Sequence, residues 1–108
     1  MSGFGTETLT HTGQIWRWSG SGNGGSWHFL TIDGEAGEAL SGTAVMRRTE
    51  GTIGGFGSIK VTARIGDSRF TTSVFPSKSE GWLLPVKASV RKAEGLAEGD
   101  AVDVQLEF

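Results

Sequence analysis

The sequence predicts a mostly β fold, a small double-split-like β-barrel of about six strands with two short helices, occupying residues 1–108 as a single domain. Three observations favour this class. Apolar and polar residues alternate along 59–65 and along 102–108, which is typical of strands with one buried face. Turn residues divide the rest into short segments, and a barrel lets short strands avoid open sheet edges. A chain of 108 residues has room for one core.

The clearest local pattern is a β-hairpin in the middle of the chain. The alternating segment 59–65 is followed by Gly66-Asp67, a two-residue turn with glycine first, which favours a type II′ turn. The next strand is expected over 68–75, because β-branched and aromatic residues dominate there. The other elements expected in this half are a strand at 82–84 ended by Pro85, a helix at 88–94 ended by Gly95 and a strand at 102–108.

The first half of the chain is less regular. The threonine-rich segment 6–18 and the aromatic segment 27–32 indicate two strands. Segment 35–48 carries alanine and leucine near helical spacing, with glutamates early and arginines late, as the helix dipole favours. Gly37 and Gly42 are each expected to weaken this helix by about 1 kcal/mol relative to alanine.

The expected elements follow the order ββαβ twice. Trp27 opens the strand before the first helix and Trp82 opens the strand before the second, which suggests a ββαβ pseudo-repeat of half the chain each. Glycine-rich loops at 19–26 and 51–57 add length to the first half. The identities beneath this repeat are few, so the pattern leaves open whether the two halves are related.

Seven short segments carry a resemblance to a known family. They are Ile65-Gly66-Asp67, Thr72–Pro76, Gly81–Lys87, Val90–Lys92, Gly95–Asp100 and the aromatic segments Ile15–Trp18 and Trp27–Phe29. Together they resemble the bacterial family of domains of unknown function DUF1905, over most of the chain and most strongly over 53–108. The resemblance implies a small β-barrel related to the double-split barrels. It implies no activity and no catalytic residues, because the family has none assigned.

A narrower resemblance concerns the C-terminal part. Leu84-Pro85, a short helix through Arg91-Lys92, the turn Gly95–Asp100 and an alternating strand resemble the swapped-hairpin unit of AbrB/MazE-type DNA-binding proteins. Those units dimerise to complete one barrel. The resemblance implies an AbrB-like DNA-binding or antitoxin-type regulator as the alternative function. If the pseudo-repeat holds, this chain contains both halves, so we expect a monomer or a weak homodimer.

Residues that commonly perform catalysis or hold metals are scarce. The sequence has no cysteine, and its only histidines are His11 and His28. It shows no serine-hydrolase pattern, P-loop or metal-ligand spacing. We therefore expect a non-catalytic protein with no cofactor and no metal, and keep an enzyme of unknown reaction as the third hypothesis. With no membrane-length apolar segment and no recognisable signal peptide, we expect a cytoplasmic location and no membrane partner.

Aromatic residues gather on two neighbouring strands. Alternation places Trp16 and Trp18 on one face with Arg17 on the other, and it places Trp27 together with Phe29. Rings arranged in this way can stack against bases or sugars. In a chain with few large aliphatic side chains they can also form the core, which is the interpretation we favour.

Charge is segregated along the chain. Seven basic and two acidic residues lie from Lys60 to Lys92, whereas all the charged residues after Lys92 are acidic. If the last strand pairs with a basic strand, these charges are neutralised across the strands, and we favour this outcome. Otherwise a basic face remains for an anionic partner. The net charge of −2 argues against nucleic acid as that partner.

The sequence thus favours a non-catalytic ligand-binding or interaction module, with a small anionic ligand or a protein as its partner. Three basic residues near the junction between Pro85 and the second helix, and three tryptophans on strands, are the candidates for ligand contact. They are Lys78, Lys87, Arg91, Trp16, Trp27 and Trp82.

Overall fold

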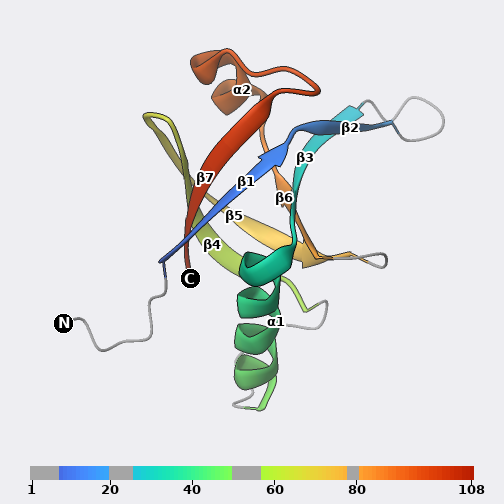
Figure 1. Ribbon diagram of the computed structural model, residues 1–108, viewed down its shortest axis with the longest axis vertical. Coiled ribbons are helices and arrows are strands. Elements are labelled where there is room, and N and C mark those ends of the chain that lie inside the picture. The colour runs from blue at the N-terminus through green and yellow to red at the C-terminus, as the bar shows by residue number, and fades with distance from the viewer. Residues whose placement is uncertain (1–7, 20–25, 50–56, 78–80) are drawn as a thin grey trace.

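A computed structural model describes residues 8–19, 26–49, 57–77 and 81–108. In these residues the chain forms one antiparallel sheet, curled into a half-barrel, and two helices at opposite ends of the molecule (Figure 1). The mostly β class is confirmed. Along the chain the elements are β1 (Thr8–Gln14), β2 (Trp16–Ser19), β3 (Ser26–Ile32), α1 (Gly34–Thr49), β4 (Ile59–Ile65), β5 (Ser68–Pro76), β6 (Trp82–Pro85), α2 (Ala88–Glu94) and β7 (Ala101–Glu107).

The sheet has seven described strands in the order β1-β7-β4-β5-β6-β3-β2, and not about six, because the long strand expected over 6–18 breaks at Ile15. Before the break β1 pairs with β7, and after it β2 pairs with β3. The Ile15 amide donates to the Asp100 carbonyl at 3.0 Å, and the Gly99 amide donates to the Ile15 carbonyl at 2.7 Å. Since β1 and β2 stand at opposite ends of the strand order, the chain at Ile15 joins both ends and curls the sheet.

One face of the curled sheet, called here the inner face, forms the hydrophobic core. Side chains alternate between buried and exposed along β4 and β7, as their sequences predict. Helix α1 packs against this face with Ala36, Leu40 and Ala44, which recur every four residues on one side of the helix. The indole of Trp82, on β6, is buried and donates its Nε1–H to Ser41 Oγ of α1 at 3.0 Å. The helix is thereby fixed to the sheet by both packing and a hydrogen bond.

The structure confirms the two structural roles predicted for glycines, a hairpin turn at Gly66 and a helix end at Gly95. Gly66 has a φ of +58° in the β4–β5 turn, while Asp67 has no positive φ, as a type II′ turn requires. Gly95 has a φ of +65° and its amide bonds back to the last turn of α2, which ends that helix. The loop segments 20–25 and 51–56, expected as glycine-rich connections, lie outside the described residues.

Candidate functional site

The face of β2 and β3 opposite the core carries a cluster of aromatic side chains. Trp16 lies directly across from Phe29 and Trp18 directly across from Trp27 in the antiparallel register. Leu30 and Ile32 of β3 point into the core, so alternation directs Trp27 and Phe29 to the outer face. The four rings therefore lie together on the outside of the half-barrel.

The aromatic cluster continues across the neighbouring strands. On β6, Pro85 lies across from Phe29, and Leu83 lies across from Phe75 of β5. These side chains line a shallow groove of about 450 Å³, here called the aromatic groove. Its lining residues are Trp16, Trp18, Trp27, Phe29, Phe75, Leu83 and Pro85.

The groove exposes unusually large apolar side chains to solvent. The exposed fractions are 49% for Trp18, 55% for Trp27 and 41% for Phe75. In the described part of the chain, these are three of the five exposed large hydrophobic residues. The preference for a core role was therefore wrong for all four rings, Trp16, Trp18, Trp27 and Phe29, none of which belongs to the buried core. Contiguous exposed apolar surface of this kind marks interaction sites in folded proteins.

Contacts among the rings hold part of this surface in place. The Trp16 and Phe29 rings are 5.2 Å apart and tilted by 37°, while Trp27 and Phe29 are nearly parallel at 6.3 Å. The Trp16 indole donates its Nε1–H to Thr31 Oγ1 at 2.9 Å. Trp16 and Phe29 thus form a fixed base, and Trp27 presents an open ring face beside it.

One end of the groove is polar. An adjoining hollow of about 440 Å³ shares Trp27, Phe75 and Pro85 with the aromatic groove. The rest of its lining is Phe70, the hydroxyl residues Thr71, Thr72 and Ser73, and Lys87. The exposed Lys87 ammonium group lies 5.8 Å from the centre of the Phe70 ring, a cation–π contact that leaves it open to solvent. We call this hollow the polar end.

The structure brings together only some of the residues predicted for the site. Trp16, Trp27 and Lys87 line the groove and its polar end. Trp82 lies on the inner face with 5% of its surface exposed. Arg91 lies elsewhere, where its Nε–H donates to the Val86 carbonyl at 3.1 Å. Lys78 lies outside the described residues.

Several residues that line the aromatic groove were not predicted from the sequence to contact a ligand. Trp18 and Phe29 shared a predicted face with Trp16 and Trp27, so the alternation signal was available for both. Phe75, Leu83 and Pro85 come from β5 and β6, and only the pairing of those strands places them in the groove. That pairing is a long-range property with no local signature.

The last strand pairs with a basic strand, as the neutralisation hypothesis assumed, but no opposite charges face each other in the β4–β7 register. Strand β7 pairs with β4, where Thr62 lies across from Glu107 and Arg64 across from Gln105. Arg69 forms an ion pair with Glu107 at 3.2 Å. Both side chains are exposed, so the pair contributes little stability, but it removes one free cation from this face.

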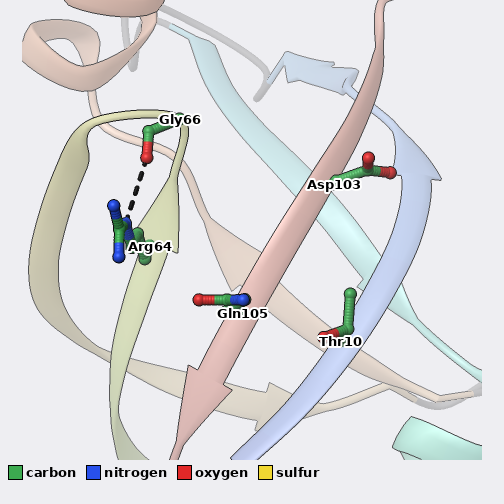
Figure 2. A pocket seen from close by; sticks show the side chains of 5 residues that line it. All are labelled: Thr10, Arg64, Gly66, Asp103 and Gln105. Carbon is green, nitrogen blue, oxygen red and sulfur yellow. Dashed lines mark hydrogen bonds between the residues drawn. The ribbon is translucent and has the colours of Figure 1, made fainter.

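A polar hollow of about 420 Å³ lies over β1, β7 and β4 (Figure 2). Its lining consists of Thr10, Arg64, Gly66, Asp103 and Gln105. The Arg64 side chain donates from Nε to the Gly66 carbonyl at 3.2 Å, and Asp103 accepts from Thr12 Oγ1 at 2.6 Å. Arg64 lies across from Gln105 in the β4–β7 register, and among the described ion pairs none joins Arg64 to Asp103. Apolar contact area is small here, which makes this hollow a weaker site than the groove.

His28 lies in an environment that changes its pKa. Its ring is half-buried on the same side of β3 as the core residues, and its Nδ1 is shielded from solvent with no hydrogen-bond partner. Burial lowers the pKa of His28 below 6.5, and the positive charges of Arg91 and Arg17 lower it further, partly offset by Glu98. The imidazole is therefore neutral at pH 7.

Nowhere in 8–19, 26–49, 57–77 and 81–108 do three or more histidine, aspartate or glutamate side chains gather in a way that could hold a metal ion. Neither described helix is long and apolar enough to cross a membrane.

The fold and the site define a small antiparallel β half-barrel with an open aromatic groove on its outer face. The sequence profile of the family described as domain of unknown function DUF1905 matches residues 11–106. The chain belongs to the DUF1905 family, which confirms the resemblance found from the sequence. No curated protein matches the chain.

Proposed function

We propose that this protein is a non-catalytic binding module whose aromatic groove holds a small ligand with a flat apolar body and an anionic group. The observation that carries the proposal is the exposure of Trp18, Trp27 and Phe75 around one groove. Leaving such rings in water is unfavourable by about 25 cal/mol per Å² of apolar surface, so a ligand that covers them gains that free energy.

The dimensions and the apolar lining of the groove favour a ligand with a flat apolar body. Its volume of about 450 Å³ falls in the range of small-molecule sites, and its lining is almost entirely apolar. The exposed rings of Trp27 and Trp18, which lie across from each other, offer stacking surface. Ring-on-ring stacking of this kind contributes about 1–3 kcal/mol per ring.

The polar end favours an anionic group on the same ligand. A ligand stacked on Trp27 extends along the shared wall toward Lys87, which is exposed and makes no ion pair with a described carboxylate. Thr71 and Ser73, which alternation places on the same side of β5 as Phe75, add hydroxyl donors there. A carboxylate or phosphate attached to the flat body would be held there by charge-assisted hydrogen bonds.

The strand pairing supports the finer fold prediction, a double-split-like barrel built from two ββαβ halves. One half contains β1/β2, β3, α1 and β4, and the other contains β5, β6, α2 and β7. When each strand is replaced by its counterpart in the other half, the same strand pairs result. The pair β2–β3 becomes β5–β6, β1–β7 becomes β5–β4, and the pairs β3–β6 and β4–β7 map onto themselves. One chain then supplies both halves that a swapped-hairpin dimer would supply, which supports a monomer or a weak homodimer.

The proposal is tested with 2-naphthoate, a flat aromatic carboxylate, and its neutral counterpart 2-naphthalenemethanol, each titrated by calorimetry. The wild-type protein is expected to bind the carboxylate more tightly than the alcohol. Trp27→Ala should weaken both about tenfold, because it removes one stacking ring. Lys87→Gln should weaken only the carboxylate, because it removes the cation.

Two variants provide matched controls. Met46→Ala removes an exposed apolar side chain from α1, and Lys60→Gln removes a cation from β4, both away from the groove. If Trp27→Ala binds both compounds as Met46→Ala does, the groove is not the binding site and the proposal fails.

The AbrB-like alternative, binding to DNA, makes a different prediction. It requires a dimer whose DNA affinity falls steeply with salt, because phosphate contacts release counterions. The pairing of Arg69 with Glu107 leaves fewer free cations on the basic segment, which favours the small-ligand proposal. A mobility shift at low salt would support the alternative.

A further inference from the structure

The side of the β2–β3 ribbon opposite the aromatic groove carries a basic cluster made of Arg17, His28 and Arg91. Arg17 lies directly across from His28 in the antiparallel register, so both side chains leave the same face of the ribbon. The His28 carbonyl accepts the Val86 amide at 2.9 Å, and the Val86 carbonyl accepts Arg91 Nε–H at 3.1 Å. The Arg91 side chain is thereby held near His28, and the charges of both Arg17 and Arg91 act on the imidazole.

These three side chains have unused hydrogen-bonding capacity. In the described part of the chain, no carboxylate reaches ion-pair distance of Arg17 or Arg91, and Glu98 approaches His28 without bonding to it. Arg91 uses only its Nε–H, which leaves the rest of its planar fork free. His28 Nδ1 is shielded from solvent without a partner, which leaves Nε2 as the ring nitrogen that can donate to a ligand.

We propose that the basic cluster is a second binding site, selective for an oxyanion such as a phosphate or carboxylate group. Because Nδ1 of His28 is shielded and unpartnered, the ring proton is placed on Nε2, which donates to the anion. The free donors of Arg17 and Arg91 bind the remaining oxygens.

The site is independent of the aromatic groove, because it lies on the other face of the same strands. Trp16 and Trp18 flank Arg17 in sequence but point to the opposite side. An oxyanion bound at Arg17 therefore cannot contact the Trp27 ring. The two proposals can fail separately.

The test is a titration with inorganic phosphate at pH 7.5 and constant ionic strength, followed by the NMR signals of the two histidine rings. His28 is expected to shift in a saturable way while His11, which lies on β1, serves as the internal reference. Arg17→Gln should weaken phosphate binding about tenfold or more, because it removes a charge-assisted donor. Arg17 is exposed and makes no bond within the described chain, so the fold should be retained.

Lys60→Gln is the matched control, because it removes the same charge from an exposed position on β4. A second titration with acetate separates the two sources of oxyanion: a response to both ions indicates a general oxyanion site, and a response to phosphate alone indicates a phosphate site. The proposal is overturned if His28 does not respond to either ion, or if Arg17→Gln and Lys60→Gln bind phosphate equally well.

Discussion

His11 Nε2 on β1 lies 2.9 Å from the main-chain carbonyl oxygen of Thr31 on β3. The two strands are not paired in the sheet, so this side-chain bond bridges the open side of the half-barrel. The Asp33 carboxylate lies 3.6 Å from the same nitrogen. His11 is thus a link between two strands that are far apart in the strand order.

Replacing His11 tests this bridge. His11→Leu should lower the free energy of unfolding by about 1–2 kcal/mol, because it leaves the Thr31 carbonyl without its donor. Urea unfolding followed by tryptophan fluorescence measures the change. Thr10→Val, an exposed neighbour on the same strand, is the control and should stay within about 0.5 kcal/mol of wild type. Equal effects of the two variants would show that the bridge is energetically unimportant.

The two glycines of α1 should respond in opposite directions to alanine. A Cβ at Gly37 would lie 2.7 Å from the Ile32 carbonyl oxygen, whereas a Cβ at Gly42 would meet nothing within 4 Å. Gly42→Ala should therefore stabilise the protein by about 0.5–1 kcal/mol through helix propensity and reduced chain entropy. Gly37→Ala should destabilise it by about 1–3 kcal/mol through overpacking. Thermal unfolding measures the change in stability of both variants. If both become more stable, or both less stable, the packing explanation is refuted.

His28 should make stability depend on pH. Since its pKa is lowered in the folded protein, the unfolded chain binds more protons below pH 6.5, and unfolding becomes easier as the pH falls below that value. The contribution of His28 is thus fully present above pH 6.5 and is lost as the pH falls toward the folded pKa. His28→Gln should remove this share of the pH dependence. Denaturant unfolding between pH 7.5 and 5.0 in a phosphate-free buffer measures it, and identical pH profiles for variant and wild type would contradict the assignment.

The sequence predicted most elements because their signals are local. Alternation located β4 and β7, and glycine located the β4–β5 turn and the end of α2. The break at Ile15 was missed because its cause is long-range: the Ile15 backbone bonds to Gly99 and Asp100, more than eighty residues away. Gly37 looked like a weak point of α1, and only the close Ile32 carbonyl shows why alanine does not fit there.

The candidate site was predictable to the extent that it follows strand alternation. Alternation correctly grouped Trp16 with Trp18 and Trp27 with Phe29, but it does not say which face of a strand meets the core. That choice depends on how the sheet curls and where α1 packs. Trp82 shows the same ambiguity, since it opens a strand as Trp27 does but points inward to Ser41. Exposure of the groove is therefore a property of the assembled sheet.

The central claim, that the aromatic groove binds a flat anionic ligand, is tested most directly by the four tryptophan indole N–H signals in ¹⁵N NMR spectra. Titration with 2-naphthoate should shift the signals of Trp18 and Trp27 strongly and that of Trp16 less, because its Nε1–H is bonded to Thr31. The buried Trp82 signal should stay in place. Unchanged Trp18 and Trp27 signals up to the solubility limit of the ligand, or an equal shift at Trp82, would contradict the account.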